Sequence, residues 1–297
     1  MKSDLITIAI PYHKNPAYLQ VALDSVAKQT LLPAEVIVID NSIEGDAKTL
    51  MQHSILEIQY VRAAPDLGLA AYFNQCLDMA KTPWCVILHW DDIILPDYIE
   101  SMSEAIARHP EAAGIFCKTC AIDIDGRPSF SFKDWGKQFF WPAGHAEMKL
   151  HGENSLAALL RANFIMCPTM CYNLPLLQNR RFSPRWDMLL DLDFYGHLLL
   201  EGQTLIGIPK VMYACRRHPS AASSIHEKNF SMFSEGVRCI DALANEAAGK
   251  GWHKAAGVGK RKIIYHLYVA FRTLCNLRPD NIRESLRFVH RYITGQN

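Results

Sequence analysis

The sequence contains no apolar run long enough to cross a membrane. Its longest runs, residues 5–10 and 84–88, have the length of strands, whereas a membrane-spanning helix needs about 20 apolar residues. The first residues also lack a signal-peptide pattern. Nine scattered cysteines, an odd number, favour free thiols in a reducing compartment over a disulfide framework. These absences predict a cytoplasmic protein.

An excess of charge of one sign is also missing. The 31 Lys and Arg residues and 30 Asp and Glu residues give a net charge of +1, so the whole molecule has no bulk attraction for nucleic acid. We therefore expect no nucleic-acid partner. No G-x-G-x-x-G motif follows the first strand-like run, which disfavours a dinucleotide-dependent oxidoreductase.

The first hundred residues alternate between short β-branched runs and helical patterns. The strand-like runs lie at residues 5–10, 35–40, 58–61 and 84–88, with helical patterns at 18–29, 46–53 and 69–79. Continuous apolar strands alternating with helices indicate a mostly parallel central sheet covered on both faces, which is an α/β fold. In such sheets ligands bind beyond the carboxyl ends of the strands.

The later sequence is less regular. Helices are predicted at residues 97–108, 153–162, 189–201, 230–248 and 260–292, strands at 114–122, 164–172 and 205–213, and a glycine-rich joint at 249–259. The aromatic, glycine-rich stretch 127–151 is typical of a loop over a site. We expect a catalytic domain at 1–226, with halves of about 1–96 and 97–226, and a C-terminal helical extension at 227–297.

Two adjacent carboxylates, Asp91 and Asp92, follow the fourth strand-like run. Mg²⁺ binds through one or two carboxylates together with substrate phosphates, and such an ion neutralises a diphosphate leaving group. The alternative is a turn and helix cap before Leu95 and Pro96, because acids are common there. The pair alone does not decide between these two interpretations.

The order of several motifs resembles glycosyltransferase family 2, which has the GT-A fold. The motifs are ITIAIPY at residues 6–12, EVIVIDNS at 35–42, LGLA at 67–70, Asp91-Asp92, DLDFY at 191–195 and RRHP at 216–219. The resemblance spans residues 5 to about 224. It implies an inverting, Mg²⁺- or Mn²⁺-dependent transfer from a nucleotide-sugar donor to a saccharide or lipid-linked acceptor, in bacterial-type polysaccharide or glycoconjugate synthesis.

The resemblance also implies roles for donor-binding residues. Pro11 and Tyr12 match residues that contact the nucleobase, and Asp40 with Asn41 matches an acidic pair after the second strand. Asn41 stands where relatives commonly have an acid, which leaves UDP and dTDP both open.

Further along the chain, Gly68 and Asn74 match positions beside the donor. Asp92 matches the direct metal ligand, and Asp91 matches the acid that faces the donor ribose or sugar. His89 stands where an acid is often found.

Asp191 matches the catalytic base of this family, which removes the proton of the acceptor hydroxyl. Asp187 and Asp193 are the rival acids, and helix capping is the alternative role for such acids. His218 matches a histidine that approaches the diphosphate or the metal. Arg216 and Arg217 are candidates for phosphate contacts, although solvated arginines are equally consistent with the sequence.

Weaker signals allow further hypotheses. Trp90, Trp135 and Trp186 are candidates for acceptor contacts, and the aromatic loop with Trp135 and Trp141 could stack on a sugar or cover the donor. A hydrophobic cluster under the loop is the alternative. A zinc site would use two spaced cysteine pairs, Cys117 with Cys120 and Cys167 with Cys171. Free thiols are favoured, because strand alternation sends Cys117 and Cys120 to opposite faces.

The C-terminal fifth is basic. A basic amphipathic helix there could contact the inner face of a membrane or a second copy of the chain, but a helix packed on the catalytic domain is favoured. The basic residues are Lys250, Lys254, Lys260, Arg261, Lys262, Arg272, Arg278, Arg283, Arg287 and Arg291.

Two other functions fit an α/β sheet of this kind. A sugar-phosphate nucleotidyltransferase would need a glycine-rich basic loop after the first strand, and residues 10–14 lack it. A non-catalytic nucleotide-sugar-binding protein would not need Asp91, Asp92 and Asp191 together.

Overall fold

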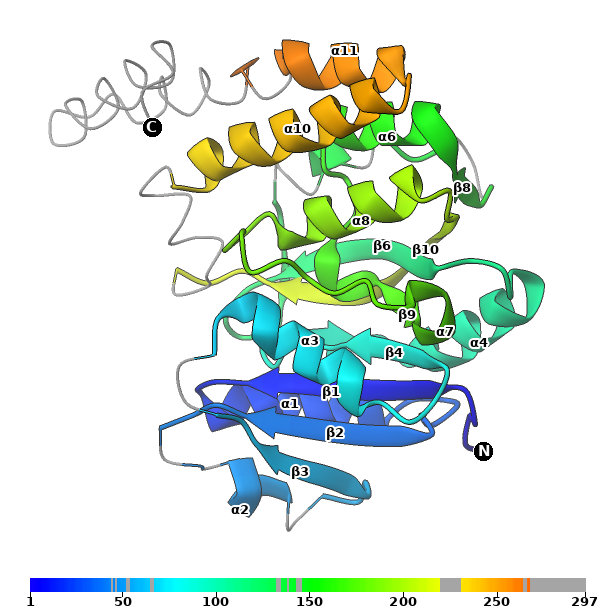
Figure 1. Cartoon of the computed structure of the whole chain (residues 1–297). Helices are drawn as coiled ribbons and strands as arrows, with labels where there is room; N and C mark the ends of the chain where they lie inside the picture. The colour runs from blue at the N-terminus through cyan, green and yellow to red at the C-terminus, as the bar shows by residue number, and fades with distance from the viewer. Residues whose placement is uncertain are drawn as a thin grey trace, which may run out of the picture.

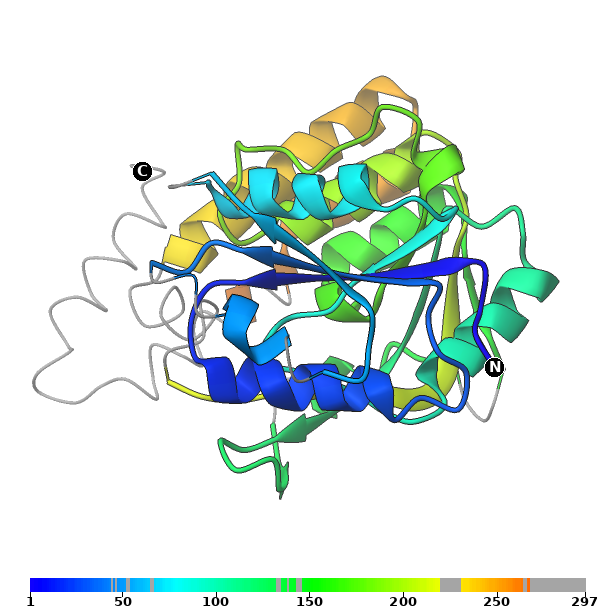
Figure 2. The ribbon, with the colours of Figure 1, turned by 90° about the horizontal axis from the view of Figure 1, so that it is seen from below.

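The computed structural model describes residues 1–43, 45, 47–51, 54–64, 67–131, 135–137, 139–142, 146–219, 231–263 and 266–267. Within them a ten-stranded sheet lies between two layers of helices (Figures 1 and 2). The order of the main strands is β3-β2-β1-β4-β9-β6-β10-β5, with β7 paired to β6 and β8 to β10.

The first four strands form the parallel part of the sheet. They are β1 (Ile6–Tyr12), β2 (Glu35–Asp40), β3 (Ile58–Arg62) and β4 (Trp84–Ile87). The connecting helices are α1 (Pro16–Ala27), α2 (Ala47–Met51) and α3 (Leu69–Met79). The predicted alternation of strands and helices is confirmed, because each β-branched run is short enough for a strand and mostly apolar.

The second half of the sheet includes reversed strands. Its members are β5 (Ile93–Ile94), β6 (Gly114–Ile122), β7 (Pro128–Ser129), β8 (Met148–Leu150), β9 (Cys171–Asn173) and β10 (Leu205–Arg216). Because β9 is antiparallel to both β4 and β6, β6 and its parallel neighbour β10 run in the same direction as β1–β4. The main strands other than β5 and β9 are therefore co-directional, as the predicted mostly parallel sheet requires.

Each face of the sheet is covered by its own helices. The helices α1 and α4 (Tyr98–Arg108) cover one face, and α3, α6 (Gly152–Arg161) and α8 (Leu190–Leu200) cover the other. Successive residues of β2 alternate between the two cores: Val36 and Val38 join the first, Ile37 and Ile39 the second. Each such buried side chain stabilises the fold by about 1.5–3 kcal/mol.

The strand predicted at residues 164–172 is wrong. A short 3-10 helix, Cys167–Thr169, stands there, and β9 begins only at Cys171. Pro168 explains the difference, because proline lacks the N–H that a central strand needs and suits the first turn of a helix. A short helix α7 (Leu174–Leu177) follows β9.

The glycine-rich joint predicted at residues 249–259 is partly wrong. Helix α10 (Ser231–Gly249) is followed by helix α11 (His253–Arg261) after a tight turn. A Cβ at Gly259 would lie 2.6 Å from the Cβ of Ala244, so this glycine permits close packing of α11 on α10. The rest of the predicted helix 260–292, with five of the ten basic residues named for the tail, lies largely outside the described residues.

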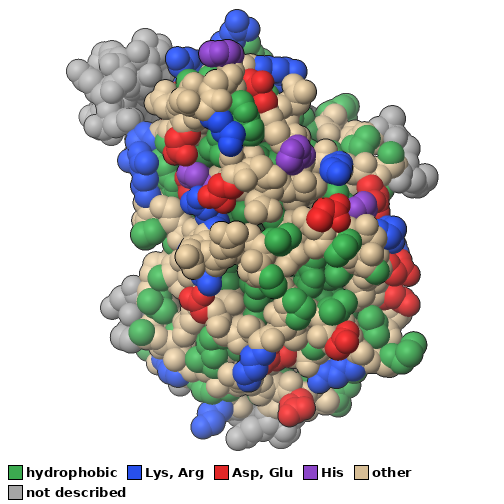
Figure 3. Space-filling model, turned by 45° about the vertical axis from the view of Figure 1, so that its right-hand side comes forward, with side chains coloured by type: hydrophobic (Ala, Val, Ile, Leu, Met, Phe, Trp, Pro, Cys, Tyr) green, Lys and Arg blue, Asp and Glu red, His purple; other side chains and the backbone are tan. Residues whose placement is uncertain are grey.

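The two C-terminal helices join the core rather than standing apart from it. Cys239, Leu243 and Ala247 of α10 and Ala255 of α11 are fully buried in the same cluster as α6 and α8. Among the described residues no helix is long and apolar enough to span a bilayer. On the face drawn in Figure 3, basic and acidic side chains are interspersed.

Candidate active site

Three potential metal ligands meet just beyond the carboxyl end of β4. The chain leaves β4 at Ile87, turns at residues 90–91, and enters β5 at Ile93. In this turn His89, Asp91 and Asp92 each place one ligand atom so that the three atoms lie within 4.8 Å of one another. A nitrogen and two carboxylate oxygens at this spacing are a suitable donor set for a divalent cation.

Asp92 is buried and is fixed by strand β10. Its Oδ1 accepts a hydrogen bond of 2.7 Å from the backbone N–H of Arg216. The pairing of β5 with Tyr213 and Ala214 of β10 brings these two segments together. Burial, together with the neighbouring charge of Asp91, raises the pKa of Asp92 to about 8. Such an unfavourably buried carboxylate is stabilised by a cation.

Asp91 is oriented by His218, which lies 127 residues later in the chain. The Nε2 atom of His218 is 2.8 Å from Asp91 Oδ2, and the imidazole is buried. The ring of Tyr18 lies 5.8 Å from His218 and is stacked on Trp90 at 6.0 Å. The structure thus places His218 beside the acid pair, and its contact with a diphosphate or a metal stays a prediction.

His89 completes the cluster. Its Nδ1 is 3.8 Å from Asp92 Oδ2, and its buried Nε2 makes no hydrogen bond within the described part of the chain. Burial lowers the pKa of His89 despite the opposing charge of Asp91, which favours the neutral imidazole that binds metals. The residue that departs from the acidic pattern therefore offers a nitrogen in place of an acid, and the three side chains fit a bound cation.

Arg216 has a structural role that the sequence did not indicate. Its Nε donates to the Asp91 carbonyl at 2.8 Å, and its Nη1 donates to the carbonyls of Asp123 and Ile124. The guanidinium also lies 4.5 Å from the ring of Tyr18. These bonds fix a buried side chain. Arg216 therefore holds the turn at residues 89–92, here called the acid turn, rather than binding phosphate.

Asp40, at the end of β2, has a carboxylate whose oxygens already bind other groups of the protein. Asp40 is fully buried, its Oδ1 lies 3.2 Å from Arg62 Nη1 and accepts the Ser42 N–H, and its Oδ2 accepts the Tyr60 hydroxyl at 3.0 Å. These contacts shape the loop after β2. Its neighbour Asn41 is only half-buried and therefore reaches solvent at the strand end.

Pro11 and Tyr12 lie at the end of β1 and are both buried. The Tyr12 carbonyl accepts the Asn41 N–H at 2.8 Å and the Tyr72 hydroxyl at 2.5 Å. The Tyr12 ring meets Trp90 edge-on at 6.2 Å. Pro11 and Tyr12, the residues predicted to contact the nucleobase, therefore lie next to Asn41 and to the rings of Trp90 and Tyr18.

Two further predicted donor residues lie near α3. A Cβ at Gly68, the N-cap of α3, would meet nothing within 4 Å, so the space beside this residue is open. Asn74 binds the chain instead: its Nδ2 donates to the Phe182 carbonyl and its Oδ1 accepts the Phe182 N–H at 2.7 Å. Both polar atoms of the Asn74 side chain therefore bind residue 182, and its role beside the donor stays a prediction.

Asp191 lies in the first turn of α8. Its Oδ2 accepts a hydrogen bond of 3.2 Å from Asn163 Nδ2, and its Oδ1 accepts the Leu192 N–H. Burial raises the pKa of Asp191, and the positive charge of Lys137 opposes this shift. A carboxylate with a raised pKa is a stronger base than an ordinary aspartate.

Of the two rival acids, one is engaged by another side chain. Asp193 pairs with His197, whose Nδ1 lies 3.5 Å from its Oδ2; although burial acts to raise the pKa of Asp193, the bond to His197 lowers it overall. At Asp187 the backbone N–H donates to Glu235, a contact that does not involve the carboxylate. Between Asp191 and Asp193, Asp191 is the acid whose basicity is enhanced.

Glu235 of α10 holds the segment that leads into α8. Its buried carboxylate accepts the N–H groups of Asp187, Met188 and Leu189 at 3.1, 2.8 and 2.6 Å. The first N–H groups of a helix have no partner within the helix; the carboxylate satisfies the one at Leu189, the N-cap of α8, and the two donors just before it. No local sequence pattern reveals the contact, because the partners are almost 50 residues apart.

The three candidate acceptor tryptophans have different environments. Trp186 is only 2% exposed and packs between Arg185 and Arg238, so its proposed acceptor contact is corrected to a core role. Trp90 belongs to the aromatic group beside His218. Trp135 is 45% exposed and meets Phe139 edge-on, and its acceptor role stays a prediction.

The cysteines do not form a metal site in the described chain. The eight cysteines described there are free thiols, and Cys117 is buried while Cys120 is exposed, as strand alternation predicts. The metal-ligand cluster found among the described residues contains no cysteine. The zinc hypothesis is therefore not supported.

The fold is that of a GT-A glycosyltransferase. A structure of S. aureus TarS residues 1–349 in complex with UDP-GlcNAc matches 95% of this chain and 79% of that chain, with a TM-score of 0.66 and 16% identity. The same TarS region in another structure matches 94% and 77%, with a TM-score of 0.65 and 15% identity. At such low identity the likeness concerns the fold.

Sequence comparison finds a family whose model matches part of the chain. The model of glycosyl transferase family 2 matches residues 7–150, just under half of the chain. The chain is a glycosyltransferase that is similar to this family. It is 25% identical over 230 residues to an uncharacterized protein of Mycobacterium tuberculosis, covering 74% of this chain and 69% of that protein. It is 24% identical over 152 residues to an uncharacterized glycosyltransferase of Methanocaldococcus jannaschii, covering 47% and 52%.

Proposed function

We propose that this chain is a metal-dependent, inverting glycosyltransferase that moves a sugar from a UDP- or dTDP-sugar to an acceptor hydroxyl. The observation that carries the proposal is the cluster of His89, Asp91 and Asp92 at the carboxyl end of β4, where ligands of such sheets bind. Asp191, a carboxylate with a raised pKa at the start of α8, supports the transfer step.

A pyrimidine nucleotide fits the residues at the ends of β1 and β2. Asn41 is half-buried there, and its amide both donates and accepts hydrogen bonds. Uracil and thymine present the same alternation of carbonyl and N–H groups, so one amide suits both. S. aureus TarS, which shares the fold, has been solved with UDP and with UDP-GlcNAc, which supports UDP.

Mg²⁺ or Mn²⁺ would be held by Asp92, with Asp91 and His89 beside it and His218 behind Asp91. When bound, the ion supplies positive charge that stabilises the departing diphosphate. The turn is already fixed by Arg216, which binds the Asp92 carboxylate through its backbone and the Asp91 carbonyl through its side chain. The carboxylates are thus preorganised, which limits the reorganisation needed during transfer.

Asp191 acts on the acceptor. Its carboxylate takes the proton of an acceptor hydroxyl while that oxygen attacks the anomeric carbon from the face opposite the diphosphate. The new carbon–oxygen bond forms as the bond to the diphosphate oxygen breaks, so the configuration inverts. The raised pKa of Asp191 favours proton uptake, and Asn163 orients the carboxylate through a bond of 3.2 Å. The acceptor is a free or lipid-linked saccharide of polysaccharide or glycoconjugate synthesis.

The test is an assay of UDP- and dTDP-sugars with Mn²⁺ or Mg²⁺ and a panel of saccharide acceptors. Release of nucleoside diphosphate with an inverted product, read by NMR of the anomeric proton, is the expected result. Formation of pyrophosphate from a nucleoside triphosphate and a sugar phosphate would instead identify a nucleotidyltransferase. Donor binding without turnover, or full activity in EDTA, would contradict the proposed metal-dependent transfer.

A further inference from the structure

Tyr213 of β10 is a buried tyrosine whose hydroxyl contacts the acid turn from the core. The residue is fully buried, and its hydroxyl oxygen accepts the backbone N–H of His89 at 3.4 Å. The same hydroxyl forms a hydrogen bond with the Asp92 carboxylate. Because a phenol has one O–H to donate and lone pairs to accept, both bonds form at once. One side chain thus binds two of the three residues in the candidate metal cluster.

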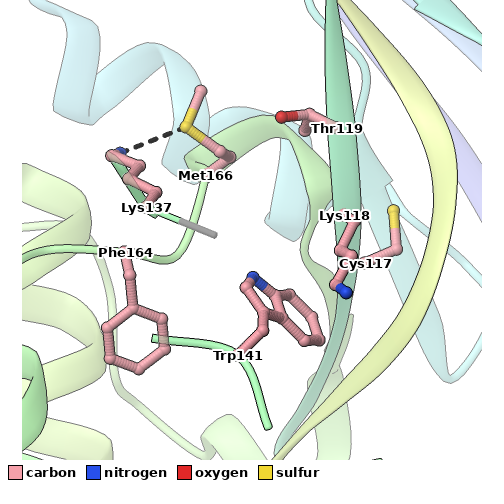
Figure 4. Close-up of a pocket in the computed structure, with 7 residues that line it drawn as sticks. All are labelled: Cys117, Lys118, Thr119, Lys137, Trp141, Phe164 and Met166. Carbon is pink, nitrogen blue, oxygen red and sulfur yellow. Dashed lines mark hydrogen bonds between the residues drawn. The ribbon is translucent and has the colours of Figure 1, made fainter. Parts of the chain in front are cut away.

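The backbone at Tyr213 is held on both edges of β10. On one edge Tyr213 lies opposite Ile94 of β5, and the Leu95 N–H donates to the Met212 carbonyl at 2.9 Å. On the other edge it lies opposite Thr119 of β6. Figure 4 shows Thr119 on β6, with strand β10 running alongside. The point from which the phenol projects is therefore set by the sheet and not by a loop.

The ring of Tyr213 is fixed by a second tyrosine. Tyr98 of α4 meets it edge-on, with ring centroids 6.4 Å apart and an interplanar angle of 69°, which is a favourable arrangement for two aromatic rings. Tyr98 is also fully buried, but its hydroxyl donates to the Thr169 carbonyl at 3.2 Å. The two tyrosines are therefore alike in type and burial and differ in what their hydroxyls bind.

The Tyr213 hydroxyl favours the form of the acid turn that accepts a cation. Burial and the charge of Asp91 raise the pKa of Asp92, and the bonds from Arg216 and Tyr213 act in the opposite direction. The hydroxyl also gives a partner to the His89 N–H, and a buried N–H without a partner is costly. Its two bonds thus hold the first and the last residue of the turn.

We propose that Tyr213 is a positioning residue of the metal site, whose hydroxyl holds the Asp92 carboxylate and the His89 backbone in the arrangement that receives a divalent cation. Tyr213 is fully buried and acts through these two residues, without contact to the donor sugar. The proposal rests on the proposed function, because it concerns the cation of that same site. Partners that orient metal ligands typically contribute about 10–100-fold to metal affinity.

The test compares Tyr213→Phe with the matched control Tyr98→Phe. Each variant keeps its ring, and with it the contact between the two rings, and loses one buried hydroxyl. Titration calorimetry with Mn²⁺, in the presence of UDP and at the same pH for all proteins, measures the affinity. We expect Tyr213→Phe to bind Mn²⁺ roughly tenfold or more weakly than the parent protein, and Tyr98→Phe to bind it with parental affinity. Both variants should melt a few degrees below the parent, because each loses a buried hydrogen bond.

The outcomes separate positioning from stability. Equal Mn²⁺ affinity of Tyr213→Phe and the parent would overturn the proposal and leave the metal-dependent transfer standing. The same weakening in both variants would also overturn it, because the cause would then be a looser core and not the lost contact with the acid turn. A parent protein that binds no Mn²⁺ would refute the metal site itself, and the role of Tyr213 with it.

Discussion

At the scale of single residues, the charge of the acid turn depends on whether Asp92 is protonated. Asp92 is buried next to Asp91, and both effects raise its pKa to about 8. The N–H of Arg216, the Tyr213 hydroxyl and the charge of Arg217 act in the opposite direction and compensate part of this cost. A proton or a metal cation can neutralise the remaining buried charge of Asp92. The two therefore compete for the same carboxylate.

This competition predicts that Mn²⁺ affinity depends on pH. Below about 8 the protonated form of Asp92 prevails, and binding must displace its proton; affinity should rise about tenfold per pH unit from pH 6 and level off above 8. His89, whose pKa is lowered by burial, stays neutral over this range. Calorimetric titration with Mn²⁺ at several pH values measures the slope. Asp92→Asn is the control and should bind weakly at every pH, and a flat profile for the parent protein would contradict the mechanism.

A second residue-scale prediction concerns the base. Asp191→Asn should reduce transfer by roughly 10²–10⁴-fold, the usual contribution of a positioned base, with little change in the thermal shift given by UDP. Asp193→Asn is the matched control in the same helix turn, since its partner is His197. It should lower the melting temperature and leave most of the transfer rate. If the two variants exchanged these effects, the assignment of the base would move to Asp193.

At the scale of elements, the start of α8 depends on a carboxylate from another helix. Glu235 of α10 accepts three consecutive N–H groups just before the helix that carries Asp191. Because a buried N–H without a partner is costly, this contact fixes both the helix end and the orientation of its first turn. The C-terminal extension thereby reaches the candidate active site without contacting a substrate.

We predict that Glu235→Ala lowers the free energy of unfolding by roughly 1–3 kcal/mol and also lowers kcat. Glu235→Gln should recover part of both losses, because one amide oxygen can still accept two of the three bonds. Glu246→Ala on the same helix removes only an exposed pair with His197 and should cost at most about 1 kcal/mol. Chemical denaturation and transfer kinetics measure these effects. A kcat unchanged in Glu235→Ala would show that the cap stabilises the fold without positioning Asp191.

At the scale of the whole molecule, the chain has one continuous core on the α8 face. Leu160 of α6, Leu199 of α8 and Leu243 of α10 are buried in the same cluster. Gly196 of α8 lies directly under Leu243, where a Cβ would approach its Cδ1 to 2.7 Å. The extension is therefore packed as an integral layer of the described structure (Figure 1).

Removal of this layer should destabilise the entire protein. A chain that ends at residue 230 loses α10 and α11 and exposes the apolar surface of α6 and α8, so we expect aggregation or loss of a cooperative thermal transition. A chain that ends at residue 267 keeps every core residue that the structure describes and serves as the control. Circular dichroism melting of both chains checks the prediction. A cooperative transition in the shorter chain would show that the catalytic part folds independently.

The sequence by itself determined the strands and connecting helices of the parallel half of the sheet and the place of the turn that carries Asp91 and Asp92. Apolar β-branched runs such as residues 35–40 report burial on both faces, and this local property was sufficient to predict the parallel half of the sheet. It also placed Asp91 and Asp92 at a strand end. Motif order added Asp191 and His218, although their roles stay predictions.

Only the tertiary structure decided which polar side chains form hydrogen bonds within the protein. Arg216 binds the acid turn, Asn74 clamps Phe182, and Glu235 caps the start of α8. Each contact joins segments that are from almost 50 to more than 120 residues apart. A residue's type and its sequence neighbours limit which bonds it can form, but the choice among them depends on the packing of the sheet and its helices.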